Sequence, residues 1–418
     1  MKYLRTMDDL PDIMGFRCLL RVDWNVPFIG GKVSDASRIE RVVPTIIELV
    51  KRKAKVVILS HLGRPQNQRD DRFSLRQVAD VAECILKRKI IFVKDCIGSL
   101  LSQEVSALSN GGIILAENVR FYSGEENNDP HFVEMLAENG DFYVNDAFSV
   151  SHRSHASIEG LSRSLPSCIG RSMQKELSML DQCLDLSQKP IIAITGGSKV
   201  STKIDLLVNL AKKVDFLVVG GGMANSFLAS RGVNIERSLC QHDCDQSVRQ
   251  IVLEAQKSGC EIILPKDVVV AEKLEAGIET QNVSIKSIPK DSMILDIGSQ
   301  TVEYIKKSIE QARTLIWNGP LGVFEVDPFD RSTVEIACHV AHLTKGKNII
   351  SIAGGGDTLR ALSHAGAVND FTYVSTAGGA FFEWLEGKEL PGIAALYDGD
   401  KCLRLNKQVA SAGMEDAH

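Results

Sequence analysis

The sequence predicts an α/β fold in two domains, each a parallel β-sheet flanked by helices. Short β-branched runs alternate with helical patterns along the whole chain, and that order is typical of parallel sheets joined by crossover helices. The chain has 418 residues, whereas one domain commonly takes roughly 100–200, so we expect two hydrophobic cores. With 44% hydrophobic and 24% charged residues, the composition excludes a disordered or fibrous chain.

Short apolar runs mark the predicted strands, and their continuous apolar character is typical of strands covered on both faces. In parallel sheets ligands bind beyond the carboxyl ends of the strands, so the residues after each run are the candidates for chemistry. The runs are Arg17–Val22, Lys55–Ser60, Gly112–Ala116, Asp141–Asn145, Ile191–Thr195, Asp215–Val219, Glu261–Leu264, Thr314–Trp317, Asn348–Ile352 and Phe371–Ser375.

Two amphipathic helices are predicted between the first strands. The first carries apolar residues at i, i+3, i+4, i+7, i+8 and i+11, namely Ile39, Val42, Val43, Ile46, Ile47 and Val50. The second begins at Ser74, which has the spacing of a capping box with Gln77. Its apolar face consists of Leu75, Val78, Ala79 and Ala82.

The boundary between the domains is expected around residues 165–188. Leu165-Pro166-Ser167 precedes a long helical pattern, Gly170–Leu184, and Lys189-Pro190 then opens a new strand. The tail after Leu396 lacks periodicity, and we expect it to be partly disordered. We therefore divide the chain into an N-terminal domain (1–165), a connecting helix and hinge (166–188), a C-terminal domain (189–385) and a C-terminal segment (386–418).

Charge and cysteine content exclude several classes of partner. The formal net charge is −5, from 48 basic and 53 acidic residues, so we expect neither a nucleic-acid partner nor a membrane partner. Ten cysteines lack paired spacing, and the first residues are charged where a signal peptide needs an apolar run. These features favour reduced thiols and a cytoplasmic location.

Arginines and small polar residues follow the strands of the first half. Several guanidinium groups in one pocket require an anion, and their fork geometry suits phosphate or carboxylate. Asp23 and Asn25 would then hold a hydroxyl beside that anion. The alternative is that each arginine is merely solvated. The candidate set is Asp23, Asn25, Arg38, His61, Arg64, Arg120 and Arg153, with His152 as a further possibility.

Glycines follow the strands of the second half. Glycine at a strand-to-helix turn lets the backbone approach a ligand and exposes helix N–H groups to anions, which is the geometry of phosphate or nucleotide binding. A tight turn explains any single pair equally well. Asp357, at the start of a helix, is a candidate to hold Mg²⁺ on those phosphates. The motifs are Gly196-Gly197-Ser198-Lys199, Gly220-Gly221-Gly222, Leu295-Asp296-Ile297-Gly298, Asn318-Gly319-Pro320, Gly354-Gly355-Gly356-Asp357-Thr358 and Ala377-Gly378-Gly379.

Other known site patterns are absent. No G-x-x-x-x-G-K-[ST] occurs, and Gly220-Gly221-Gly222-Met223 does not complete a G-x-G-x-x-G fingerprint. Cys240 and Cys244 lack the second ligand cluster of a tetrahedral zinc site, and no G-x-S-x-G elbow of a serine hydrolase is present.

The ordered set of motifs resembles the phosphoglycerate kinase family from about residue 12 to 396. The matching segments are RVDWNVP, SHLGRP, ENVRF, NDAFSVSHRSHAS, GGSKVSTK, GGGMA, LDIG, WNGPLGVFE, GGGDT, STAGGA and EGKELPG. The resemblance implies two Rossmann-like domains, joined by a long helix and hinge, with a C-terminal segment that returns to the first domain. It also implies a monomer that catalyses reversible Mg²⁺-dependent phosphoryl transfer between 1,3-bisphosphoglycerate and ADP, giving 3-phosphoglycerate and ATP.

The resemblance assigns roles residue by residue. Contacts to 3-phosphoglycerate are expected at Asp23, Asn25, Arg38, His61, Arg64, Arg120 and Arg153. Contacts to the nucleotide are expected at Gly196, Gly197, Lys203, Gly221, Gly298, Asn318, Glu325, Gly355, Gly356, Asp357 and Thr358, with Asp357 near the metal. The groups expected to act on the transferred phosphoryl are Arg38, Lys199, Lys203, Gly378 and Gly379.

The chain departs from the family pattern at several positions. Trp24 stands where phenylalanine is usual, Ser198 where alanine is usual, Ser149-Val150-Ser151 where Gly-Thr-Ala is usual, and Ala377 where the first of three glycines is usual. Two rival functions have distinguishing features. A catalytically silent binding protein would have lost Arg38, Lys203 or Asp357, and a nicotinamide dehydrogenase would need the missing dinucleotide fingerprint.

Overall fold

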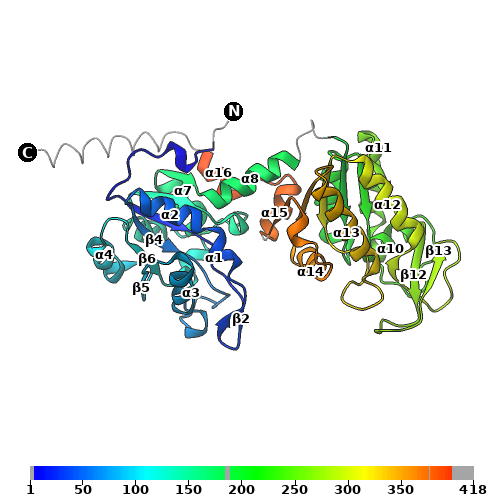
Figure 1. Cartoon of the computed structure of the whole chain (residues 1–418), viewed down its shortest axis with the longest axis horizontal. Helices are drawn as coiled ribbons and strands as arrows, with labels where there is room; N and C mark the ends of the chain where they lie inside the picture. Colours follow the sequence, from blue (N-terminus) through cyan, green and yellow to red (C-terminus); the bar gives the residue numbers. More distant parts are fainter. Residues whose placement is uncertain (1–3, 184–188, 376, 398–418) are drawn as a thin grey trace, which may run out of the picture. The chain divides into compact units, whose positions relative to one another are not determined.

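The structure is a computed structural model that describes residues 4–183, 189–375 and 377–397. Its described part divides into two compact units (Figure 1). The first contains the residues up to Leu177 together with those from Glu389 on, and the second runs from Ser178 to Lys388. Among the described helices, none has the length and apolar character needed to cross a membrane.

A six-stranded parallel sheet forms the centre of the first unit. Its strand order is β5-β6-β4-β1-β7-β8. β1 is central. The strands of this sheet that follow it directly in the chain lie on the side of β4, and the later strands β7 and β8 lie on the other side. The strands are β1 (Arg17–Arg21), β4 (Lys55–Leu59), β5 (Ile91–Val93), β6 (Ile113–Ala116), β7 (Phe142–Asn145) and β8 (Ser167–Ile169), and a separate hairpin pairs β2 (Phe28–Ile29) with β3 (Lys32–Val33).

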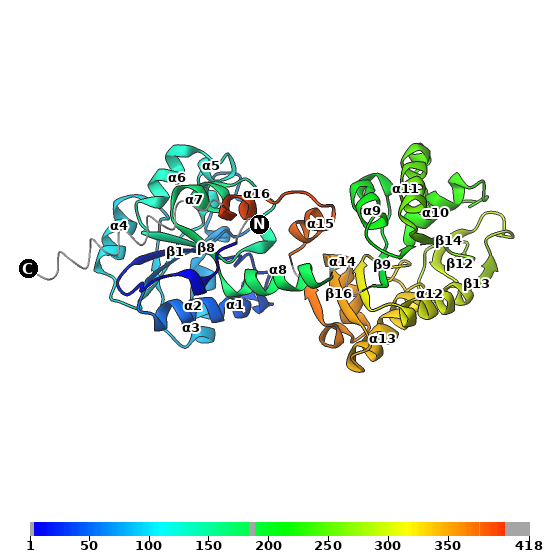
Figure 2. The same ribbon diagram turned by 90° about the horizontal axis from the view of Figure 1, so that it is seen from above.

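Helices cover both faces of this sheet, because neighbouring residues of each strand point to opposite sides. Leu20 packs into a core with α1 (Ser37–Arg41), α2 (Val43–Lys51) and α3 (Arg76–Leu86). Leu19 packs into a second core with α4 (Gly98–Ala107), α6 (Pro130–Ala137) and α7 (Leu161–Ser164), on the other face (Figure 2). The remaining short elements are α5 (Ser123–Glu126), α16 (Pro391–Ala394) and the turns η1 (Met7–Asp9), η2 (Asp71–Phe73), η3 (Val119–Phe121), η4 (Phe148–Val150), η5 (Ala156–Gly160) and η10 (Ala395–Tyr397).

Two details of the predicted helices are wrong. The helix expected over residues 39–50 is split at Val42 into α1 and α2, because Pro44 offers no N–H to the preceding turn and suits only a first turn. The capping box at Ser74 is not formed, because the Gln77 amide donates to backbone carbonyls, including that of Ser74. The predicted apolar face of that helix is buried as expected.

The second unit repeats the architecture with a sheet ordered β11-β10-β9-β15-β16-β17, in which all pairs are parallel. Its winding changes direction at β9. The strands are β9 (Ile191–Thr195), β10 (Phe216–Val219), β11 (Glu261–Ile263), β15 (Thr314–Asn318), β16 (Ile350–Gly354) and β17 (Tyr373–Ser375). A small antiparallel sheet, not predicted from the sequence, contains β13 (Gln281–Ser284), β12 (Asp267–Ala271) and β14 (Met293–Ile297).

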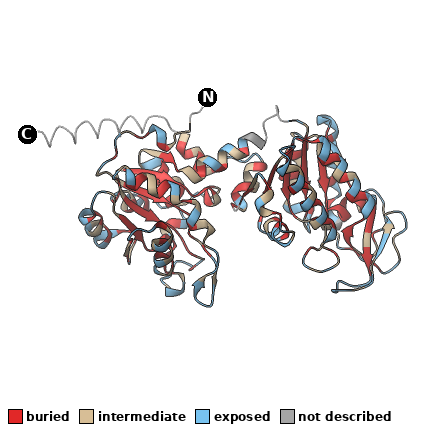
Figure 3. Ribbon diagram, viewed as in Figure 1, coloured by how far each residue is buried: buried red, intermediate tan, exposed pale blue. Residues whose placement is uncertain are grey.

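Helices again cover both faces of the large sheet, and in Figure 3 the strands are buried while the outer sides of many helices are exposed. One face packs against α12 (Ser299–Gln311), α13 (Arg331–Lys345) and α14 (Gly356–His364). The other carries α9 (Ile204–Ala211), α10 (Gly221–Ser230) and α11 (Asp245–Ser258) (Figure 2). The short elements are α15 (Gly379–Leu385), η7 (Val200–Thr202), η8 (His242–Cys244) and η9 (Val368–Asp370).

The boundary between the units falls inside α8 (Arg171–Cys183). The amino end of α8 is anchored in the first unit, since Asp146 accepts a hydrogen bond from the backbone N–H of Met173 at 2.8 Å. Residues 389–397 also pack on the first unit, where the N–H of Gly392 donates to the carbonyl of Ser151 at 2.9 Å. The expected end of the helix at Leu184, the rest of the linker to residue 188 and the tail from residue 398 lie outside the described residues.

Candidate functional site

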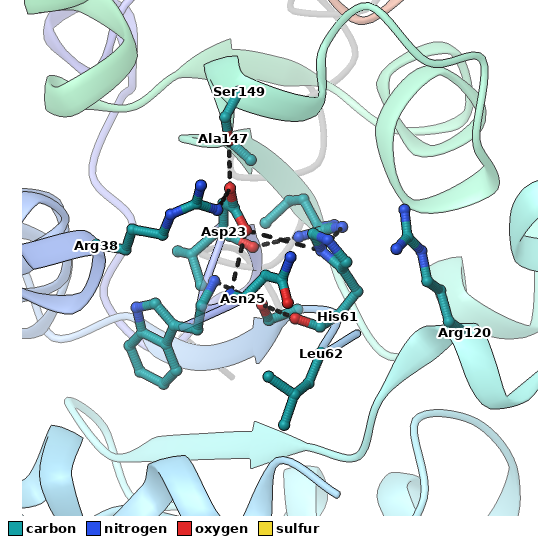
Figure 4. Close-up of polar contacts among 12 residues, drawn as sticks. Asp23, Asn25, Arg38, His61, Leu62, Arg120, Ala147 and Ser149 are labelled. Carbon is teal, nitrogen blue, oxygen red and sulfur yellow. Dashed lines mark hydrogen bonds and ion pairs between the residues drawn. The ribbon is translucent and has the colours of Figure 1, made fainter. Parts of the chain in front are cut away.

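The first candidate site is built around Asp23, directly beyond the carboxyl end of β1. Figure 4 shows Asp23 in contact with Arg38, His61 and Ser149. Its Oδ2 accepts hydrogen bonds from the guanidinium of Arg38, on α1, and from the hydroxyl of Ser149, on η4. Its Oδ1 accepts the N–H of Asn25 at 3.1 Å and lies 3.9 Å from Nδ1 of His61. Asp23 is only 8% exposed, so these groups fix the position of a nearly buried carboxylate.

His61 is buried at the end of β4 and is held in its neutral form. Burial lowers its pKa well below the usual value, and four guanidinium charges lower that pKa further, those of Arg21, Arg120, Arg153 and Arg38. Nδ1 lies 3.2 Å from a terminal nitrogen of Arg21. Because Arg21 can only donate, Nδ1 of the neutral ring must accept, and Nε2–H remains available to donate to a ligand.

Three more arginines were predicted here, and the structure places two of them in the cluster. Arg120 donates to the carbonyl of Gly63 at 2.8 Å, and its Nε lies 3.3 Å from Glu126. Burial and the charge of Arg153 lower the pKa of Arg120 to about 10. Nε of Arg153 is buried and has no hydrogen-bond partner within the described part of the chain. Arg64 is exposed, and it is not among the four guanidiniums with the largest effect on the pKa of His61.

Two residues of this site were missed by sequence reasoning. Arg21 lies inside β1 rather than after it, is 1% exposed, and donates from Nε to the hydroxyl of Ser157 at 2.8 Å. The feature of the sequence that could have identified Arg21 is a charged residue at the end of an apolar run. Ser149 had already stood out as a departure from the family pattern, although no role was assigned to it.

The second candidate site is a cavity of about 360 Å³ in the second unit. Glycine turns form one wall and apolar side chains form much of the rest. Gly298 is not among the lining residues; it packs closely against Asp267 and Asn282. The lining residues include Gly197, Ser198, Gly221, Gly222, Leu239, Leu274, Met293, Leu321, Glu325 and Asp357.

The carboxyl ends of β9, β15 and β16 meet beside this cavity. The amide of Asn318 donates to the carbonyl of Gly354 at 3.0 Å, and the N–H of Gly196 donates to the carbonyl of Asn318 at 2.8 Å. The hydroxyl of Thr358 accepts from the N–H of Gly319 at 2.7 Å. Position 196 requires glycine, because a Cβ there would lie 1.7 Å from the carbonyl oxygen of Pro320.

Lys203 lies at this meeting point. Its ammonium donates to the carbonyl of Gly196 at 2.8 Å and to Oδ1 of Asn318 at 2.5 Å. It also lies 5.7 Å from the centre of the Phe382 ring. Burial lowers the pKa of Lys203 to about 8, while the carboxylate of Asp357 acts in the opposite direction.

Helix α14 begins at the same edge. Gly355 precedes it with φ +103°, a conformation that side chains rarely adopt, and Gly356 and Asp357 form its first turn. Asp357 is exposed and accepts a hydrogen bond from Arg360 at 2.6 Å. One exposed carboxylate fits the way proteins hold Mg²⁺, which takes one or two carboxylates and otherwise water and substrate phosphates.

The remaining predicted residues lie in loops of the second unit or at the start of a helix. Lys199 and Glu325 are exposed, and Glu325 lines the cavity. Gly378 precedes α15 with φ +53°, and Gly379 is the first residue of that short helix.

Comparison with known proteins decides the family. The family model for phosphoglycerate kinase matches residues 7–388. The chain belongs to the phosphoglycerate kinase family. A phosphoglycerate kinase of Agrobacterium fabrum is 56% identical over 396 residues, covering 95% of this chain and 99% of that protein. A phosphoglycerate kinase of Chelativorans sp. is 54% identical over 392 residues, covering 94% of this chain and 98% of that protein.

Solved structures of the phosphoglycerate kinase family agree with this fold. The enzyme of Coxiella burnetii superposes with a TM-score of 0.87 at 39% identity, covering 94% of this chain and 99% of that one. The enzyme of Pyrococcus horikoshii gives a TM-score of 0.77 at 28% identity, covering 94% of this chain and 98% of that one. The predicted family and fold class are therefore confirmed.

Membership of the phosphoglycerate kinase family also settles the class of activity. The chain is an enzyme, a phosphotransferase whose function is the glycolytic phosphoryl transfer of its family. This assignment sets aside the dehydrogenase alternative. The chain also keeps Arg38, Lys203 and Asp357, which a catalytically silent paralogue was expected to have lost.

Proposed function

We propose that the two candidate sites divide the phosphoryl-transfer reaction between the two units. The acid, 3-phosphoglycerate or 1,3-bisphosphoglycerate, binds at the arginine cluster of the first unit, and Mg²⁺ with ADP or ATP binds at the glycine-lined cavity of the second. The observation that carries this proposal is the contrast between the sites. One concentrates guanidinium groups around a neutral histidine, whereas the other joins an apolar cavity to glycine turns and a lysine.

In the first unit, Arg120, Arg153 and the exposed Arg64 are assigned to the anionic groups of the acid, because guanidinium forks bind phosphate and carboxylate in pairs of hydrogen bonds. Asp23 is assigned to accept a hydrogen bond from a hydroxyl of the acid, and the N–H of neutral His61 to donate to an oxygen beside those anions. Asn25 supports this arrangement, since its Oδ1 accepts the N–H of Gly63 at 2.9 Å.

In the second unit, the base and ribose are assigned to the cavity, and the phosphates to the strand ends beside it. The assigned nucleotide contacts are Gly196, Gly197, Lys203, Gly221, Gly298, Asn318, Glu325, Gly355, Gly356, Asp357 and Thr358. Asp357 would hold Mg²⁺, which neutralises negative charge on the nucleotide phosphates when it is bound.

The proposed transfer needs no general base, because the attacking group is already an anion in both directions: a nucleotide phosphate oxygen or a carboxylate. Catalysis therefore rests on in-line positioning and on stabilisation of the charge that spreads over the transferred group. Arg38, Lys199 and Lys203 are assigned to that charge, together with the N–H groups of Gly378 and Gly379.

The proposed reaction also requires the two units to come together. Reacting atoms must approach to about 3–3.5 Å, and water must be kept from the phosphoryl group. The hinges are assigned to residues 166–188 and to the segment after residue 386. Small-angle scattering should give a smaller radius of gyration with both 3-phosphoglycerate and Mg-nucleotide bound than with either one. Equal radii in every state would refute closure.

A coupled assay of ATP-dependent phosphorylation of 3-phosphoglycerate tests the proposal. We expect turnover with Mg²⁺ and a large loss of turnover when the metal is chelated. Absence of turnover from folded protein would refute the proposal. We further propose that the enzyme acts as a monomer in the cytoplasm, which size-exclusion chromatography with light scattering and cell fractionation would check.

A further inference from the structure

Ser149 makes a long-range contact with the carboxylate at the centre of the first candidate site. It lies in the short turn η4, which follows β7. Its hydroxyl donates a hydrogen bond to Oδ2 of Asp23, a residue 126 positions earlier in the chain (Figure 4). Without the Ser149 hydroxyl, Oδ2 would keep the Arg38 guanidinium as its donor.

The two oxygens of Asp23 have different surroundings. Oδ2 receives two donors, the guanidinium of Arg38 and the hydroxyl of Ser149. Oδ1 receives one, the N–H of Asn25 at 3.1 Å, and lies 3.9 Å from Nδ1 of His61. Two donors on Oδ2 fix the rotation of the carboxylate, and Oδ1 keeps a lone pair to accept one more hydrogen bond.

We infer that Ser149 is a positioning residue that orients Asp23 to accept a hydrogen bond from the 2-hydroxyl of the acid substrate. The inference rests on the proposed function, which assigns the acid to this site. Ser149 itself does not touch the ligand; it acts through the carboxylate. The hydroxyl of Ser149 therefore contributes to the preference for a hydroxy acid over the same acid without its hydroxyl.

The test compares two ligands on the full chain by calorimetry. One is 3-phosphoglycerate, and the other is 3-phosphopropionate, which keeps the phosphate and carboxylate but lacks the 2-hydroxyl. Ser149→Ala should weaken 3-phosphoglycerate binding by about five- to tenfold, the scale of one partly expressed hydrogen bond to a charged group. Binding of 3-phosphopropionate should stay within about twofold of the parent.

A second variant and a control distinguish the loss of the Ser149 hydroxyl from a general folding defect. Ser149→Gly removes the same hydroxyl without adding bulk and should show the same ligand-selective loss. Ser154→Ala is the matched control, because Ser154 lies on the same loop but donates to Glu159 instead of Asp23. It should bind both ligands like the parent.

The possible outcomes separate this inference from the proposed function. If the parent binds 3-phosphoglycerate and both Ser149 variants bind the two ligands like the parent, the inference is overturned and the proposed function stands. Equal weakening of both ligands also overturns the inference, because a structural defect produces that pattern. If the parent binds neither acid, the proposed function itself fails.

Discussion

Replacing Lys203 by methionine removes a positive charge from the point where three strand ends meet. Methionine keeps most of the side-chain length and the apolar stem. It cannot donate to Gly196 or Asn318, and it places no charge over the ring of Phe382. If the ammonium stabilises the transferred phosphoryl group, turnover should fall by about 10²–10³-fold, which corresponds to about 2.7–4 kcal/mol of lost transition-state stabilisation. Nucleotide affinity should change much less.

The pH dependence gives a second measure of the same group. Burial lowers the pKa of Lys203 to about 8, so the free enzyme carries the proton at neutral pH and loses it as the pH rises. Each further unit above that pKa lowers the protonated fraction roughly tenfold. We therefore expect kcat/KM, which reports the free enzyme, to decline above about pH 8. Lys203→Arg keeps its charge and should remove this decline.

Steady-state kinetics from pH 6.5 to 9.5 on the parent, Lys203→Met and Lys203→Arg would measure both effects. Lys213→Met is the matched control, because burial also lowers the pKa of Lys213 but this residue follows the other end of α9. The control should keep kcat within about twofold of the parent. The reasoning is refuted if Lys203→Met retains near-parental kcat with only a raised KM, or if Lys203→Arg shows the same alkaline decline as the parent.

Three further predictions concern the first unit. Arg38→Ala should lower kcat by roughly 10²-fold or more, and steady-state assays showing only a raised KM would contradict its assigned role. Arg64→Ala and Arg120→Ala should weaken 3-phosphoglycerate binding while ADP binding stays unchanged; calorimetry that shows lost ADP affinity would contradict the division of substrates between the units. Burial lowers the pKa of His152 to about 4, below its value in the unfolded chain. Protonation of this ring therefore favours the unfolded state, and the free energy of unfolding should decrease as the pH falls from about 6.5 to 4. His152→Asn should reduce that acid-induced loss in urea unfolding, and an unchanged pH dependence would argue against a neutral, buried ring.

The central strands could be predicted because a strand buried on both faces is a continuous run of apolar residues in the sequence. All ten apolar runs contain a strand of the two large sheets, with small shifts at their ends. The three-residue edge strands β5 and β8 of the first sheet were missed, whereas the equally short edge strands β11 and β17 of the second sheet were predicted. The antiparallel sheet was also missed, and its strand Gln281–Ser284 is largely exposed and polar, so it carries no apolar run.

The candidate site was predictable to the extent that its residues follow strand ends. That rule singled out Asp23 and His61, whereas Lys203 was expected only from the resemblance to the family. It could not single out Arg21, which is the last residue of a strand. The partner of Arg21, Ser157, is 136 positions away, so only the fold reveals why the charge is tolerated. The protonation state of His61 could not be predicted from the sequence either, because its neutral form depends on burial and on charges supplied by several separate segments.

If the substrates divide as proposed, the two units bind anionic ligands with different groups, and the difference follows from the size of each ligand. A three-carbon acid has little apolar surface, so most of its affinity must come from charge, and the first unit gathers guanidiniums that repel one another until an anion arrives. A nucleotide offers a base that an apolar cavity can bury, so the second unit can hold its phosphates with neutral backbone N–H groups and few cations. Under the proposed assignment, the acid would relieve repulsion among the guanidiniums on binding, whereas the nucleotide would fill a site that is already complementary to it.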